Sequence, residues 1–151
     1  MAFNTIKLKN HIDVNEEYTA AGAITPGHLC TLDSNGKVIV HAVSGGPVLI
    51  MFATEDELQG GAIDTAYAST NKVNCWFPTR GDVVYALLLD GENVAIGDFL
   101  DSSGAGTLKK AVNLTSAAVA EYPANLVGRA LEAVNLNQSS DPSARIKVQI
   151  I

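Results

Sequence analysis

The sequence has few charged residues and no long apolar run. Of its 151 residues, 17% are Asp, Glu, Lys or Arg, compared with roughly 25% in average soluble domains. The longest apolar run covers residues 47–53 and is much shorter than the roughly 18 residues of a membrane-spanning helix, so no membrane partner is expected. The first residues also lack an apolar stretch, which predicts the absence of a signal peptide.

Clusters of basic residues are scarce. Ten Lys and Arg residues against sixteen Asp and Glu residues give a net charge of −6, and only Lys7/Lys9 and Lys109/Lys110 are close neighbours. Because nucleic-acid binding depends on clustered cations, no nucleic-acid partner is expected. The apolar fraction is 47%. Combined with so few charges, it predicts that part of the apolar surface is covered by another subunit or by a partner.

The two cysteines, Cys30 and Cys75, are far apart and form no CxxC or zinc-ligand spacing. They are interpreted as reduced residues packed in strands. No cofactor and no metal are predicted.

The turn-forming residues are spaced as in an all-β protein. Short runs rich in Val, Ile and Leu alternate with Gly, Asn, Asp and Pro, which predicts short strands. These cover residues 28–32, 38–42, 48–54, 73–77, 82–89, 98–100, 107–109, 126–134 and 144–151. Residues 73–77 and 82–89 are expected to pair with each other. Helical signals are limited to single turns at 64–68 and 116–121.

The predicted fold is therefore mainly β, a small β-barrel or β-sandwich of short antiparallel strands. Residues 1–18 differ in character, because Asn and Glu dominate them, and they are predicted to form an extended N-terminal arm. Residues 19–151 are predicted to form a single β-rich domain.

Two segments of the chain echo each other. Residues 26–36 resemble residues 96–104, and each segment precedes an apolar strand with Ala and Glu two residues apart, Ala53/Glu55 and Ala130/Glu132. One interpretation is a duplicated hairpin. The other is two unrelated units of glycine turn and strand.

A search for catalytic and metal-binding groups finds three weak candidates. His28 and His41 flank a turn and could face each other as metal ligands, but neither has a further ligand nearby in sequence. Glu55 and Glu57 are the best carboxylate pair for acid–base chemistry, although a solvated loop explains them as well. Cys30 beside a histidine could be a nucleophile or a buried strand residue. No enzyme activity is predicted.

Several segments resemble capsid decoration (cement) proteins of tailed phages. The resemblance lies in residues 21–38, 52–67, 81–87, 96–102 and 127–133 and extends from about Ala20 to the C-terminus. It implies a small β-rich virion protein, made in the host cytoplasm, that binds the outer surface of the expanded capsid. It further implies a homotrimer that clamps neighbouring major capsid subunits.

Within that interpretation, the residues expected to contact the capsid from the arm are Phe3, Ile6, Leu8 and Tyr18. An alternative is a carbohydrate- or host-surface-binding β module displayed on the particle, with Trp76 and Tyr85 as stacking platforms. A third hypothesis is a small hydrolase that uses Glu55 and Glu57.

Overall fold

The computed structural model describes residues 2–112, 124–141 and 144–151. The strands are β1 (Lys7–Lys9), β2 (Asn15–Thr19), β3 (Cys30–Leu32), β4 (Val38–Val40), β5 (Phe52–Ala53), β6 (Lys72–Trp76), β7 (Val83–Leu87), β8 (Asn93–Val94), β9 (Phe99–Ser102), β10 (Leu108–Lys110), β11 (Leu126–Ala130), β12 (Val134–Asn135) and β13 (Arg145–Ile150). The 3-10 turn η1 (Glu57–Gln59) follows β5. The predicted mainly-β fold is confirmed. The predicted helical turn at 116–121 lies outside the described residues.

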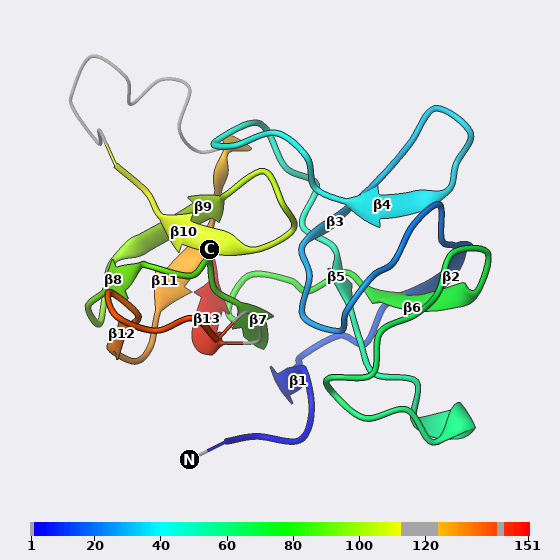
Figure 1. Cartoon of the computed structure of the whole chain (residues 1–151), viewed down its shortest axis with the longest axis horizontal. Coiled ribbons are helices and arrows are strands. Elements are labelled where there is room, and N and C mark those ends of the chain that lie inside the picture. The colour runs from blue at the N-terminus through cyan, green and yellow to red at the C-terminus, as the bar shows by residue number, and fades with distance from the viewer. Residues whose placement is uncertain (1, 113–123, 142–143) are drawn as a thin grey trace.

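The strands form four sheets in which neighbouring strands run antiparallel. The largest has the order β1-β7-β13-β11-β9-β10, a second has the order β2-β6-β5, and β3-β4 and β12-β8 are two-stranded. Within the described residues, none of these sheets closes into a barrel. Figure 1 shows β2 to β6 on one side of the molecule and β7 to β13 on the other.

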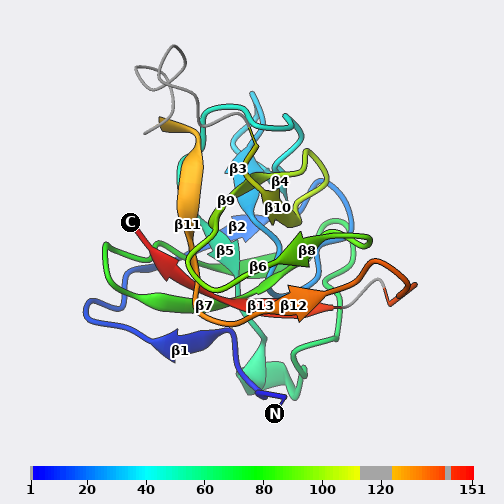
Figure 2. The same cartoon turned by 90° about the vertical axis from the view of Figure 1, so that its left-hand side faces the viewer.

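The expected pairing of residues 73–77 with 82–89 is wrong. β6 lies between β2 and β5, whereas β7 lies between β1 and β13 in a different sheet. The adjacent placement of β1, β7 and β13 is visible in Figure 2. The turn-like residues 78–81 therefore connect two sheets instead of closing a hairpin.

The two sides of the molecule repeat the same hydrogen-bonding pattern, beginning with a pair of glycines. The N–H of Gly27 donates to the carbonyl of Ala53 at 2.7 Å, and the N–H of Gly97 donates to that of Ala130 at 2.9 Å. A hairpin follows each glycine, β3-β4 in one case and β9-β10 in the other. The two echoing segments thus share the same local arrangement, as the duplicated-hairpin interpretation expects.

The repeat extends well beyond the hairpins. Ala20 donates to Asn71 and forms a parallel bridge with Val38, while Leu88 donates to Ala144 and forms a parallel bridge with Leu108. β2 pairs with β6 in the same way as β7 pairs with β13. We therefore describe the chain as two repeats: the first covers residues 14–77 and the second covers residues 82–150.

Each repeat contributes a core. The smaller core comprises Ala20, Ile24, Cys30, Val38, Met51, Ala53, Tyr67, Val73 and Cys75, all from the first repeat. The larger core is built mainly from the second repeat and also takes in Ile6, Leu29, Phe52 and Trp76. Burial of Leu29, Phe52 and Trp76 joins the first repeat to the second through the hydrophobic effect, and burial of Ile6 adds the N-terminal segment.

The N-terminal segment is extended, as expected, but it is packed against the rest of the chain. β1 pairs with β7, and β2 pairs with β6 along its whole length, across the expected arm boundary at residue 18. Ile6 is completely buried in the larger core. Residues 6–19 therefore contribute to the folded body, and binding of this segment to a partner stays a prediction.

Candidate functional site

The predicted carboxylate pair is divided between two roles. Glu55 is 7% exposed, and its Oε2 accepts a hydrogen bond of 3.1 Å from the backbone N–H of Ile6. Glu57 lies on the surface at the start of η1. The Glu55 carboxylate thus fixes the N-terminal segment, and no observation supports the hydrolase hypothesis.

The two candidate histidines have separate local partners. Nδ1 of His28 accepts from the Thr25 N–H at 3.1 Å, and burial, helped by the charge of Arg145, lowers the pKa of His28 to about 4. His41 is buried, with Nδ1 2.7 Å from the Ser102 hydroxyl and Nε2 3.0 Å from the Pro47 carbonyl. Since a carbonyl only accepts, Nε2 carries the proton in this arrangement. Among the residues that the structure describes, no three His, Cys, Asp or Glu side chains form a metal-binding group.

The cysteines are unsuited to nucleophilic chemistry in this fold. Cys30 in β3 and Cys75 in β6 are both buried and not disulfide-bonded, as expected from the sequence. Burial raises the pKa of both thiols, to about 12 for Cys75. The reactive thiolate is therefore suppressed at neutral pH.

The stacking role proposed for Trp76 is wrong, because its side chain is completely buried. The Nζ atom of Lys7 lies 5.6 Å from the centre of the Trp76 ring and helps to cover it. Tyr85 is half-buried, and its ring meets the Phe3 ring edge-on with 5.2 Å between the ring centres. Trp76 therefore presents no face for a sugar, and the Tyr85 ring is partly occupied by its contacts with Phe3 and Arg145.

The four predicted capsid-contact residues have different positions. Phe3 packs on Tyr85, Ile6 lies in the larger core, Leu8 is half-buried in β1, and Tyr18 packs against the smaller core. All four stabilise the chain itself. Capsid contacts at these residues stay a prediction.

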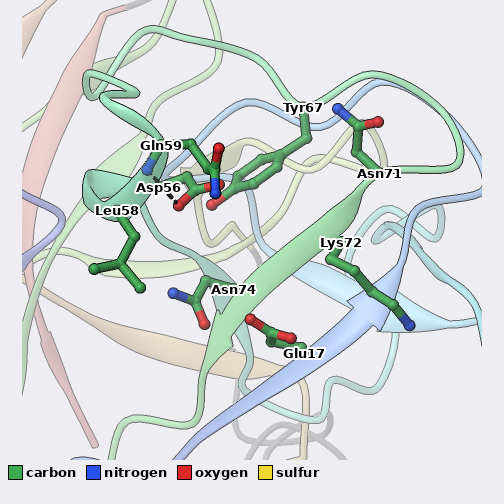
Figure 3. Close-up of a pocket in the computed structure, with 8 residues that line it drawn as sticks. All are labelled: Glu17, Asp56, Leu58, Gln59, Tyr67, Asn71, Lys72 and Asn74. Atoms are coloured by element: carbon green, nitrogen blue, oxygen red, sulfur yellow. Dashed lines mark hydrogen bonds between the residues drawn. The ribbon is translucent and has the colours of Figure 1, made fainter.

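A cavity of about 410 Å³ lies beside the β2-β6 ribbon and was not anticipated from the sequence. Its lining residues are Glu17, Asp56, Leu58, Gln59, Tyr67, Asn71, Lys72 and Asn74. Figure 3 shows Glu17 and Asn74 on neighbouring strands, with Asp56, Gln59 and Tyr67 across the cavity from them. We call this cavity the Glu17 pocket. A second cavity of about 250 Å³ adjoins it and shares Leu58 and Asn74.

Four of the eight residues of the pocket wall take part in hydrogen bonds that hold them in place. Asp56 accepts from the Gln59 N–H at 3.3 Å, the Tyr67 hydroxyl donates to the Thr54 carbonyl at 2.7 Å, and Lys72 donates to the Thr19 hydroxyl at 3.0 Å. Burial raises the pKa of Tyr67 to about 12, so this hydroxyl stays protonated. The wall carries two carboxylates and one ammonium group, an arrangement that suits a polar or cationic group. No single sequence motif marks the pocket, because its residues come from three distant segments.

Comparison with known proteins identifies a similar fold. No family model matches the sequence, and no curated protein matches it. Among solved structures, the head fiber gp8.5 N base in bacteriophage phi29 is similar, with a TM-score of 0.58 and 10% sequence identity. The match covers 93% of this chain and 95% of that one. At this identity the likeness shows the fold, which both chains share over nearly their full lengths.

Among the described residues, no helix is both long and apolar enough to cross a membrane.

Proposed function

We propose that this chain is a structural protein of a phage virion. The observation that carries the proposal is the fold shared, over nearly the whole of both chains, with the base of a phage head fiber. The segments that resemble capsid decoration proteins, such as residues 21–38 and 127–133, independently favour the same setting. Glu55, His28, His41 and the two cysteines are held in local structural contacts, which fits a protein that acts by binding.

In its specific form, the proposal is a homotrimer on the outer surface of the expanded capsid that clamps neighbouring major capsid subunits. A protein that binds only the expanded shell stabilises it by its differential affinity for that state. Several linked binding sites multiply this effect through avidity. Exposed apolar side chains such as Leu49, Leu58 and Ile96, which are 64%, 93% and 71% exposed, offer contact area for such partners.

The test is cosedimentation of purified protein with expanded, undecorated phage heads, alongside light scattering of the free protein. The proposal expects saturable binding and an increased resistance of the heads to heat. Failure to bind any expanded head would refute the capsid role, and a monomeric mass both free and on heads would refute the trimer.

A test of whether the N-terminal segment contributes to head binding requires a variant that leaves the core intact. Deletion of residues 1–18 would remove Ile6 from the core and β2 from its sheet, so loss of binding would be uninformative. Lys9→Glu changes an exposed residue of β1, and Lys37→Glu makes the same change at the exposed β3-β4 turn. Weaker head binding of the Lys9 variant alone supports the arm role, while equal binding of both variants contradicts it.

A further inference from the structure

The two repeats differ at one equivalent sheet edge. In the second repeat, β7 is covered on its outer edge by the N-terminal segment. The Tyr85 N–H donates to the Ile6 carbonyl at 2.9 Å, and the Leu87 N–H donates to the Gly27 carbonyl at 3.1 Å. The outward-pointing donors of Tyr85 and Leu87 are thereby satisfied, one by the N-terminal segment and one by the first repeat, as buried backbone groups require.

In the first repeat, the corresponding strand, β2, has an open edge. The Phe77 N–H donates to the Val14 carbonyl, and the Ala20 N–H donates to the Asn71 carbonyl. Along the strand between them, every second residue therefore directs its backbone N–H and C=O groups toward β6. This alternation turns the N–H groups of Glu17 and Thr19 away from β6. Among the described strands, none runs along that side of β2; the bridge between Ala20 and Val38 of β4 lies just beyond the C-terminal end of β2. An open edge of this kind is a template for strand addition.

The strand that covers β7 and the open strand β2 carry charges of opposite sign. The strand that covers β7 contains Lys7 and Lys9, whereas β2 contains the exposed Glu16 and Glu17. Antiparallel pairing of β2 with the β2 of a second copy would bring like charges opposite each other, which destabilises a sheet. The edge therefore favours a basic strand over its own copy.

The Glu17 pocket lies on the same ribbon. In a strand added to β2, alternate side chains point to the face that carries Glu17 and Thr19. A long cationic side chain on that face could enter the cavity of about 410 Å³ and meet the carboxylates of Glu17 and Asp56. Backbone pairing and charge recognition would then act together.

We propose that the outer edge of β2 binds an extended basic segment of a partner protein by strand addition, with a lysine or arginine of that segment in the Glu17 pocket. The edge comparison that carries this inference is independent of the capsid role. It names a binding surface of the chain and the chemistry of its ligand.

The probe is a synthetic peptide with the sequence of residues 2–10, since β1 already adds to the equivalent edge of the second repeat. The control peptide has Glu in place of Lys7 and Lys9. Binding is measured by fluorescence anisotropy, and amide exchange by NMR locates the bound peptide. The expected result is salt-sensitive binding of the basic peptide alone, with new protection of the Glu17 and Thr19 amides.

Two substitutions at one position separate the backbone from the charge. Glu17→Pro removes an outward N–H while sparing the ladder with β6, an edge position that tolerates proline, and Glu17→Lys reverses the charge. Each is expected to weaken peptide binding at least about tenfold. Asp90→Lys, which makes the same charge change at an exposed turn of the second repeat, is expected to bind as the wild type does. If Glu17→Pro fails to fold, the comparison of the two lysine variants still decides.

Four results would overturn the inference. The first is absence of peptide binding to the wild-type protein, and the second is equal binding by the Glu17 and Asp90 variants. The third is protection confined to β7 amides, and the fourth is a wild-type oligomer that Glu17→Pro converts to monomer. Those last observations would assign the peptide to the other edge, or the β2 edge to a second copy.

Discussion

Gly27 and Gly97 occupy the same position in the two repeats, and each has a backbone conformation that favours glycine. Their φ angles are 93° and 89°, and each N–H is bonded to an alanine carbonyl on the strand that follows the hairpin. The surroundings differ, because Gly27 lies against Arg145 at the junction between the repeats, whereas Gly97 lies at the edge of the second repeat near Arg129.

This relationship predicts graded effects of three alanine substitutions. Gly91 has a φ of 84°, and a Cβ added there would meet open space. Backbone strain alone should therefore make Gly91→Ala lower the free energy of unfolding by about 1–2 kcal/mol. Gly97→Ala adds a contact of 3.3 Å with the Arg129 guanidinium and should cost slightly more. Gly27→Ala would displace the Arg145 guanidinium, which donates to the Pro26 carbonyl at 2.7 Å, and should cost about 3 kcal/mol or more. Urea unfolding checks the order, and equal losses for all three would contradict the role given to the junction.

Ile6 is predicted to be a stability residue. Its side chain is completely buried in the larger core, so Ile6→Ala should lower the free energy of unfolding by about 2–4 kcal/mol. Ile12→Ala is the matched control, because Ile12 is 59% exposed, and its effect should stay within about 0.5 kcal/mol. Thermal unfolding of both variants measures the difference. Similar melting temperatures would mean that the N-terminal segment is not part of the folded body in solution.

Residue patterns predicted the strands far better than their partners. In β13, the alternation of Ile146 and Val148 with Arg145 and Lys147 matches the observed burial, because a half-buried strand has a period of two residues. Partners depend on long-range packing, which a local pattern does not encode. The short spacing between residues 73–77 and 82–89 favoured a hairpin, although each strand pairs with segments far away in the sequence.

The repeat was visible only where the backbone restricts the residue type. Glycine recurs at Gly27 and Gly97 because both need a positive φ. Core positions require only apolar volume, so Cys30 can correspond to Leu100 without a visible match. The open edge of β2 and the Glu17 pocket also escaped detection, since they arise from strand order and from the meeting of three distant segments.

Asp82 is predicted to make stability depend on pH. Its side chain is fully buried and accepts from the N–H groups of Thr79 at 2.7 Å and His11 at 2.8 Å. Burial by itself would raise the pKa of Asp82, but these bonds and the His11 ring outweigh it and hold the pKa below its ordinary value. A lowered pKa stabilises the fold above the unfolded-state pKa of about 3.9 and loses that contribution as the pH falls through the folded-state value.

Asp82→Asn should therefore destabilise the protein by about 1–3 kcal/mol at pH 7, with a smaller difference from wild type at acidic pH. Urea unfolding at several pH values between 2 and 7 tests this, with Asp90→Asn as a control for loss of an exposed carboxylate. A destabilisation by Asp82→Asn that is constant over the whole pH range would show that the Asp82 charge is not involved.

The buried thiols give a prediction about chemical reactivity. Cys30 donates to the His28 carbonyl at 3.4 Å, and both cysteines lie in the smaller core. Because burial raises the pKa of both thiols, native protein at pH 8 should react with a thiol reagent only as fast as it opens, and both should react at once in denaturant. Labelling followed by mass spectrometry measures the two rates, with Ile6→Ala expected to accelerate native labelling by loosening the fold. Rapid modification of one cysteine in the native wild-type protein would mean that the first repeat opens in solution independently of the second.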